Sequence, residues 1–221
     1  MVKPLFFNMS LIGRLLRFFF YHLYHGLAFT YDAVAWLVSF GQWTDWMESA
    51  LPYVQGTRVL ELGHGPGHLQ RALRGRKLVA VGLDESPQMG HLARQRLFHS
   101  GYAQVDLVRG LGQSLPFEAE AFDSLIATFP AEYIFEARTL SEARRVLRNG
   151  GRLIVLPAAW PGNPLLRWLY RVTGESPAEA LEVVKKKWSL PFVRAGFETR
   201  IEILEVKSSV LMFVICNKKV D

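Results

Sequence analysis

The chain has 221 residues, half of them hydrophobic, which fits one globular domain with a large core and excludes an intrinsically disordered protein. Its net charge of +6 suits an anionic partner or a membrane surface, but it is too small for a dedicated nucleic-acid binder. The single cysteine, Cys216, cannot form an internal disulfide and favours a reducing compartment, so we expect a cytoplasmic protein.

An aromatic, weakly basic segment opens the chain. Residues 9–25 have the periodicity of a helix, and the first 31 residues contain three basic residues and no acidic one. The uncharged run at 18–31 is shorter than the roughly 20 apolar residues that a transmembrane helix needs. Two alternatives stay open: this helix packs on the domain or covers a ligand, or it makes peripheral contact with a membrane.

A second helix is predicted over 33–51, and beyond it strands alternate with helices. Such alternation predicts a doubly wound, mostly parallel sheet with helices on both faces. We therefore expect an N-terminal helical extension or lid over 1–52 and a Rossmann-like α/β domain over 53–221. The expected strands are 58–63, 78–84, 103–110, 122–130 and 152–159, and the expected helices are 69–75, 86–101 and 136–151.

The end of the chain departs from this alternation. Residues 160–187 indicate a helical insertion after the fifth strand, either a lid over a ligand or a helix docked on the sheet. The insertion ends in three lysines, which indicate a solvated run or a contact with anionic lipid. A helix at 188–197 follows, and the strands 198–206 and 209–219 form an antiparallel pair, giving seven strands with an antiparallel C-terminal strand.

The segment "VLELGHGPGHLQ" (59–70) lies between the first strand and its helix. Its glycines, Gly63, Gly65 and Gly67, permit a tight turn and close approach of a ligand to the backbone. The spacing is not the G-x-G-x-x-G of dinucleotide-binding proteins, and the loop has no lysine to hold phosphates. The loop therefore indicates a ligand without a phosphate chain.

The second strand ends in Asp84, about 20 residues beyond the glycine loop, where a carboxylate can accept hydrogen bonds from the hydroxyls of a ribose. A ribose without phosphates points to a nucleoside. A nucleoside joined to an amino acid, as in S-adenosylmethionine, satisfies both observations.

Four segments in order resemble the class I S-adenosylmethionine-dependent methyltransferases, in particular the small "type 11" group that includes quinone- and lipid-methylating enzymes. The resemblance covers residues 55–160 in detail. Its segments are "VLELGHGPGHL", "VGLDESPQM", "SLPFEAEAFDSLIATFP" and "EARRVLRNGGRLIVL". It implies a cofactor, S-adenosyl-L-methionine, used as methyl donor.

The resemblance also implies positions for the cofactor. Glu61 and the amides of the three glycines should hold its amino-acid end, Asp84 the ribose, and Glu85 and Met89 the adenine. His64 lies within the loop and is expected near the cofactor. Tyr31 resembles a tyrosine that covers the cofactor, and Thr128 and Phe129 should line the junction between cofactor and acceptor.

One departure from the family concerns adenine. Family members usually carry Asp-Ala where this chain has Leu111 and Gly112, so the carboxylate that accepts the adenine amino group is missing. Gln113, or the backbone at 111–113, is the expected replacement.

The acceptor side carries weaker signals. Glu132 and Tyr133 follow the fourth strand, where acceptor contacts commonly arise in this family, and His22 and His25 share one face of the first helix. Methyl transfer from a sulfonium needs an aligned nucleophile and little else, so a general base is required only if the acceptor must lose a proton. No third ligand accompanies the two histidines, and we expect no metal site.

The expected function is methyl transfer to a small, hydrophobic, lipid- or quinone-like acceptor. Two alternatives stay open: a non-catalytic cofactor-binding protein that works through a partner, and methylation of RNA or protein. The absence of Asn-Pro-Pro-Tyr at 128–133, which read Thr-Phe-Pro-Ala-Glu-Tyr, disfavours methylation of base amino groups. The oligomeric state and the acceptor itself are not predicted.

Overall fold

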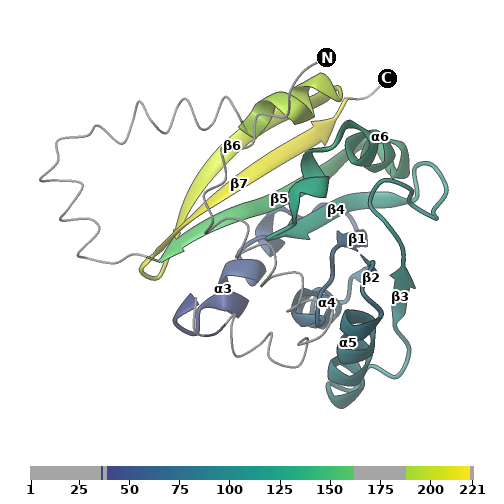
Figure 1. Ribbon diagram of the computed structural model, residues 1–221, viewed down its shortest axis with the longest axis vertical. Coiled ribbons are helices and arrows are strands. Elements are labelled where there is room, and N and C mark those ends of the chain that lie inside the picture. Colours follow the sequence, from purple (N-terminus) through teal and green to yellow (C-terminus); the bar gives the residue numbers. More distant parts are fainter. Residues whose placement is uncertain (1–35, 37–38, 162–187, 220–221) are drawn as a thin grey trace, which may run out of the picture.

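The computed structural model describes residues 36, 39–161 and 188–219. In these residues seven strands form one sheet in the order β3-β2-β1-β4-β5-β7-β6 (Figure 1). β7 pairs antiparallel with β5 and β6, and the other neighbouring strands of the sheet pair in parallel, which confirms the predicted sheet. The strands are β1 (Arg58–Leu62), β2 (Val79–Asp84), β3 (Asp106–Arg109), β4 (Phe122–Thr128), β5 (Leu147–Pro161), β6 (Phe197–Val206) and β7 (Ser209–Lys218).

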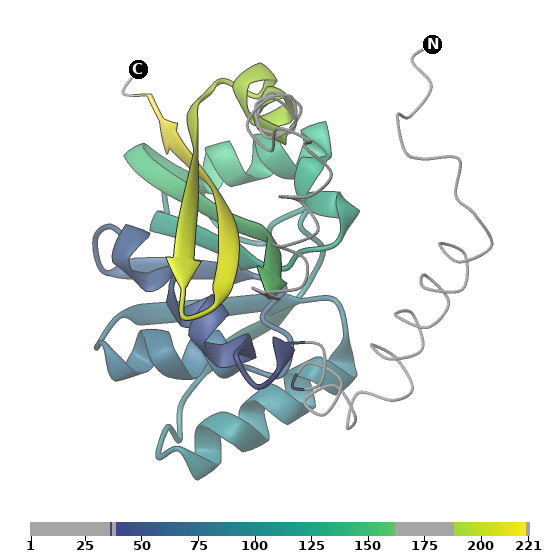
Figure 2. The ribbon, with the colours of Figure 1, turned by 90° about the vertical axis from the view of Figure 1, so that its left-hand side faces the viewer.

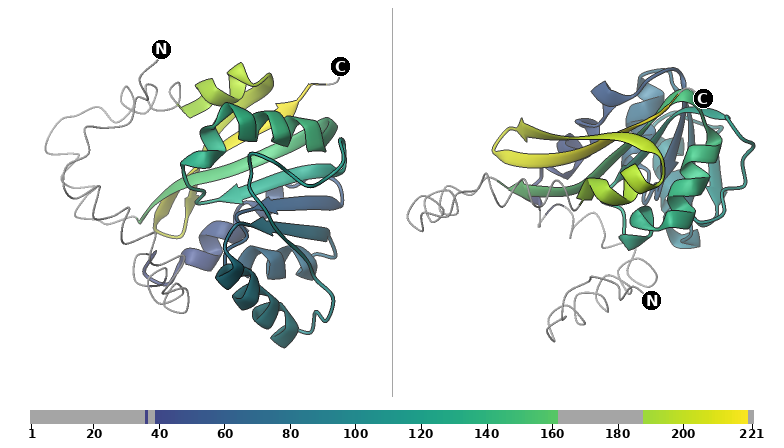
Figure 3. Two further views of the ribbon diagram at one scale, coloured as in Figure 1. Left: turned by 45° about the vertical axis from the view of Figure 1, so that its right-hand side comes forward. Right: turned by 90° about the horizontal axis from the view of Figure 1, so that it is seen from above.

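Helices cover both faces of the sheet (Figure 3). α3 (Trp43–Glu48), α4 (His68–Gly75) and α5 (Pro87–His99) lie on one face, and α6 (Ala137–Val146) and the helix at 188–194 lie on the other. Each face has its own core: one contains Trp46 and Leu69, and the other contains Leu140 and Phe192. The long apolar runs of β4 and β7 follow from burial on both faces.

Two predicted helices are shorter than expected. The helix predicted over 33–51 is interrupted at Phe40 and Gly41, whose φ angles of 51° and 78° are left-handed and cannot continue an α-helix. The helix predicted over 136–151 ends at Val146, because Leu147 already pairs with Phe122 of β4. The predicted helix 9–25 and most of the insertion 160–187 lie outside the described residues, as do Lys185, Lys186 and Lys187, and the boundary between extension and domain stays a prediction.

α3 is fastened to the outer edge of the sheet. The turn between β6 and β7 lies beside this helix (Figure 2). Lys207 in that turn forms an ion pair with Asp45, and Ser209 donates to the Gln42 Oε1 atom at 3.1 Å. The hairpin and the start of the described chain therefore support each other.

Asp123, in the Phe-Asp part of the third family segment, has a structural role. Its Oδ2 accepts hydrogen bonds at 2.8 Å from the backbone N–H groups of Thr57 and Arg58, and its carboxylate pairs with Arg148. An added Cβ at Gly56 would lie 2.2 Å from the Asp123 Cγ atom. These contacts join the beginnings of β1 and β4, at the opposite end of the sheet from the glycine loop.

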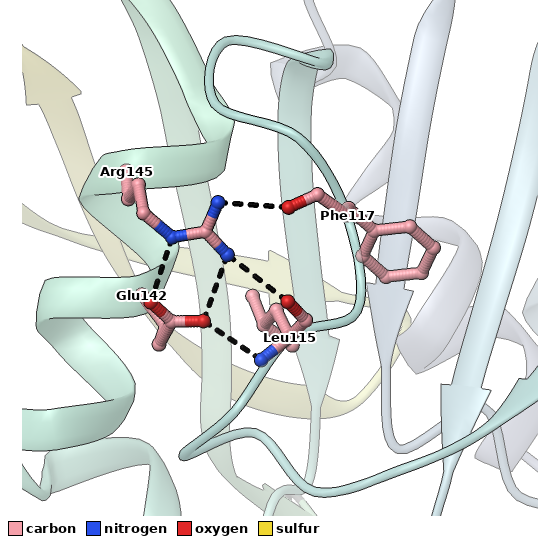
Figure 4. A network of polar contacts seen from close by, with 4 residues as sticks. All are labelled: Leu115, Phe117, Glu142 and Arg145. Carbon is pink, nitrogen blue, oxygen red and sulfur yellow. Dashed lines mark hydrogen bonds and ion pairs between the residues drawn. The ribbon is translucent and has the colours of Figure 1, made fainter.

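The Leu-Pro-Phe segment between β3 and β4 is held by α6 (Figure 4). Glu142 accepts from the Leu115 N–H at 2.8 Å. Arg145 donates to the carbonyls of Phe117 and Leu115 at 2.7 and 3.0 Å and to both oxygens of Glu142. Two side chains of one helix thus satisfy three backbone groups of a loop and join the third family segment to the fourth in this chain.

Replacing Glu142 with Gln should destabilise the protein by about 1–2 kcal/mol, because it weakens hydrogen bonds to Arg145 and to a backbone amide. The Arg145 guanidinium lowers the pKa of Glu142, so its stabilising effect is present above the unfolded-state pKa and is lost as pH falls through the folded-state value. Urea unfolding at pH 7 and pH 3 measures this, with exposed Glu118→Gln as control. An equal effect of Glu142→Gln at both pH values would contradict the assignment.

Candidate functional site

The glycine loop joins β1 to α4 at the carboxyl edge of the parallel strands. Gly63, Gly65 and Gly67 have φ angles of 72°, 50° and 85°, in the left-handed region that favours glycine. The N–H groups of Gly63 and His64 donate to the Leu83 carbonyl at 2.7 and 3.2 Å. The end of β2 therefore fixes the path of the loop.

The three glycines have different surroundings. A Cβ at Gly67 would lie 2.9 Å from the Ala93 Cβ, so this glycine allows α5 to pack against the loop. A Cβ at Gly63 would lie 2.9 Å from the hydroxyl of Tyr133. A Cβ at Gly65 would meet nothing within 4 Å, so the middle of the loop faces open space. Among the described residues, Gly65 therefore has room beside it for a ligand.

Asp84 orients the loop through its carboxylate. Its Oδ2 accepts from the Gly65 N–H and its Oδ1 from the Ser86 N–H, both at 2.9 Å. Each carboxylate oxygen has a further lone pair, so a half-buried Asp84 held in this way can also accept from hydroxyl groups. This fits the predicted ribose contact.

The residues after Asp84 begin α5. Ser86 is the N-cap, and its hydroxyl accepts from the Met89 N–H at 3.3 Å. Met89 is fully buried in the structure, whereas the side chain of Glu85 is exposed and its carbonyl accepts from Arg109 at 3.0 Å. Their predicted contacts with adenine stay predictions.

Glu61 is buried on the side of β1 that faces α4, with 2% of its surface exposed. Its Oε2 accepts from the Gln70 Nε2 at 2.8 Å, while the Gln70 Oε1 has no hydrogen-bond partner among the described residues. Burial, together with the negative charge of Asp84, raises the pKa of Glu61 to about 8. Within the described residues the Gln70 Oε1 atom still lacks a donor, and an ammonium group such as that of S-adenosylmethionine could supply one and would favour the ionised form of Glu61.

His64 is also buried beneath the loop. Its Nδ1 lies 2.7 Å from the Gly65 carbonyl oxygen, and its Cδ2 would be 3.0 Å from a Cβ at Gly82. Burial lowers the pKa of His64, which favours the neutral ring. The ring packs on β2, and its predicted approach to the cofactor stays a prediction.

The loop after β3 forms another side of the candidate site. Leu111 is 52% exposed, Gly112 is buried, and Gln113 donates from Nε2 to the Glu136 Oε2 at 3.0 Å. Gln113 is the predicted replacement for the missing aspartate. Its amide nitrogen is thus hydrogen-bonded to Glu136, the residue that precedes α6.

The end of β4 is aromatic. Phe129 has a left-handed φ of 50° and donates its N–H to the Leu156 carbonyl at 2.7 Å. Its ring stacks on Trp43 with a centroid distance of 4.3 Å, and Trp46 lies tilted beside both. Trp43 was not among the predicted site residues. Trp43 and Trp46 share one helix, but their spacing alone does not indicate that they pack on Phe129.

The structure thus brings together Glu61, the glycine loop, Asp84 and the residues after β3 and β4. His22, His25 and Tyr31 lie outside the described residues. Within the described ranges, no three His, Cys, Asp or Glu side chains are grouped so that they could hold a metal ion. Nor does any helix in those ranges have the length and apolarity to cross a membrane.

Replacing Glu61 with Gln should remove a pH dependence of stability. Because the folded-state pKa of Glu61 is raised to about 8, the wild type should lose stability as pH rises from about 4.5 toward 8, and the Gln variant should not lose this contribution. Urea unfolding at pH 5.5 and 8 measures the difference between the two proteins, in which the titration of His64 cancels. The exposed Glu48→Gln is the control. Parallel pH profiles for wild type and Glu61→Gln would disprove the shift.

Comparison with known proteins gives concordant results. The model of the ubiE/COQ5 methyltransferase family matches residues 19–175. A demethylmenaquinone methyltransferase from Clavibacter sepedonicus is 32% identical over 155 residues, 68% of this chain and 62% of that protein. One from Thermotoga maritima is 29% identical over 206 residues, 90% of this chain and 83% of its own length.

Among solved structures, a SAM-dependent methyltransferase from Aquifex aeolicus superimposes with a TM-score of 0.59 at 20% identity, covering 84% of this chain and 97% of that one. This likeness concerns the fold. The chain spans 62% of the length of the Clavibacter relative. This match therefore does not by itself assign the activity of the whole relative to this chain. The family match, the sheet order and the geometry of the glycine loop agree, and the chain belongs to the ubiE/COQ5 methyltransferase family.

Proposed function

We propose that the protein is an S-adenosylmethionine-dependent methyltransferase acting on a small, hydrophobic, quinone-like acceptor. The observation that carries the proposal is the link between Asp84 and Gly65, a 2.9 Å hydrogen bond that holds a side-chain-free bend beside a carboxylate. A nucleoside without phosphates fits this arrangement, because the loop has no lysine or arginine and the N–H groups of its glycines already donate within the protein.

In this proposal the chain's own residues bind and orient the donor. Asp84 accepts from the ribose hydroxyls, and the open space at Gly65 admits the amino-acid end. The buried carboxyl of Glu61 and the Gln70 Oε1 atom, which has no donor among the described residues, favour a positively charged ligand in the neighbourhood of the loop. When bound, the cofactor supplies an electrophilic methyl group on a sulfonium, whose departure leaves a neutral thioether.

The acceptor is proposed to lie at the carboxyl end of β4. Phe129 and Trp43 present stacked aromatic rings there, and flat aromatic surfaces favour ring-shaped, apolar ligands. The names of the relatives, demethylmenaquinone methyltransferase and ubiquinone/menaquinone biosynthesis C-methyltransferase, support a quinone precursor as the class. Peripheral membrane contact through the N-terminal segment would serve such an acceptor and stays part of the proposal.

Asp84→Ala should weaken binding of S-adenosylmethionine by roughly ten- to a hundredfold, because charged hydrogen bonds to the ribose are lost. Isothermal titration calorimetry measures the affinity. The matched control is Asp106→Ala, at the start of β3, whose carboxylate is 69% exposed and lies 4.0 Å from Arg74. Equal affinities of the wild type and Asp84→Ala would show that Asp84 does not hold the ribose.

Methylation should be found in the lipid fraction. Purified protein with methyl-labelled cofactor and extracts from cells that accumulate unmethylated quinones should transfer label to organic-soluble material. Label confined to polar metabolites or RNA would contradict the proposed acceptor class. Cofactor affinity with no transfer to any fraction would instead support the non-catalytic alternative. Asp84→Ala serves as the low-activity control for chemical background.

A further inference from the structure

Tyr133 crosses the space between the two loops that are proposed to hold the two ends of the cofactor. It lies in the short 3-10 helix Glu132–Phe135 that follows β4. Ile134, beside it, is fully buried and anchors this turn in the core. Tyr133 itself is half-buried and packs against the same core, so its position is set by β4 and α6.

Two glycines provide the room for this side chain. The Tyr133 hydroxyl would lie 2.9 Å from a Cβ at Gly63, in the glycine loop. The ring atoms Cδ2 and Cε2 would each lie 3.0 Å from a Cβ at Gly112, in the loop after β3. Real Cβ atoms rarely make contacts this short, so an alanine at either position would require the tyrosine to shift, at Gly112 by a few tenths of an ångström.

Gly112 occupies one of the two positions at which the chain departs from the Asp-Ala of its family. With alanine at position 112 the tyrosine ring would have to move away from this loop by a few tenths of an ångström. The departure therefore removes an acidic side chain at position 111 and at the same time admits a phenol to the same region. A phenol both donates and accepts hydrogen bonds and offers an aromatic face, and a nucleoside can use each of these.

We propose that Tyr133 is a cofactor-contact residue, whose ring lines the pocket beside Gly112 and whose hydroxyl makes a polar contact near Gly63. Its contribution to affinity replaces that of the carboxylate missing at position 111. This assigns Tyr133 to the donor side of the site, whereas the sequence pattern indicated the acceptor side. The inference rests on the proposed function, because it requires that the protein bind S-adenosylmethionine.

Calorimetry with S-adenosylmethionine and with S-adenosylhomocysteine tests this. Tyr133→Ala should weaken binding of both compounds about tenfold or more, and Tyr133→Phe by only about two- to fivefold, since it keeps the ring and loses one hydrogen bond. Tyr102→Ala is the matched control: that half-buried tyrosine lies at the end of α5, with its hydroxyl 3.9 Å from a Cβ at Gly75. Circular dichroism and thermal unfolding confirm that each variant is folded.

A double-mutant cycle separates contact from general damage. Gly112→Ala should weaken binding about tenfold in the wild-type background, because the new methyl displaces the ring, and less than twofold when Tyr133 is already Ala. Full additivity of the two substitutions would overturn the coupling that the inference requires.

The outcomes for Tyr133→Ala distinguish the inference from the proposed function. If the wild type binds the cofactor and Tyr133→Ala binds equally well or more tightly, Tyr133 is a wall or an obstruction and the inference alone is wrong. If the folded wild type binds neither compound, the proposed function fails and the inference fails with it.

Discussion

The carboxylate of Asp84, at the end of β2, holds the loop that follows β1, and the geometry of the site depends on this contact. Its two oxygens hold the middle of the glycine loop and the start of α5 in one position. The Leu83 carbonyl also holds the loop, so the loop is anchored by the last two residues of β2. Without this link, left-handed glycines would leave the loop free to adopt many conformations.

Beneath this fixed loop lies a cluster whose polar groups are not all satisfied. Burial raises the pKa of Glu61 and lowers that of His64, so both side chains favour their neutral forms. In the part of the chain that the structure describes, no donor reaches the Gln70 Oε1 atom. A ligand with a positive charge would change the balance in favour of the ionised carboxylate, and such couplings are common at functional sites.

The periodicity of the sequence predicted the sheet well, because β1, β2 and β4 are short apolar runs bounded by helix or turn signals. β1 and β2 differ from the predicted ranges by one residue, and the antiparallel pair at the end was anticipated. The early end of α6 was not, because it depends on the pairing of Leu147 with β4. The break at Phe40 was not predicted either, although Gly41 is a local stop signal whose N–H donates to the Trp36 carbonyl at 2.8 Å. β3 was predicted twice as long as it is, because only Asp106–Arg109 pairs with β2.

Site residues were predictable where the backbone dictates them. Glycines and Asp84 follow from the loop and the strand end, and the structure brings them together. The aromatic stacking of Trp43 on Phe129 joins residues 86 positions apart in a pairing that no local pattern encodes. The same is true of Tyr133, whose neighbours Gly63 and Gly112 lie in two other loops.

The hydrogen bond and ion pair between α3 and the β6–β7 turn give the outer edge of the sheet a role beyond closing the core. Trp43 belongs to the helix that Asp45 and Gln42 fasten to this hairpin, and the same ring supports Phe129. Direct contacts therefore connect the β6–β7 turn, α3 and the stacked rings of Trp43 and Phe129. The aromatic surface against which the proposed function places the acceptor is thus held in part from the edge of the sheet, far along the chain from the glycine loop.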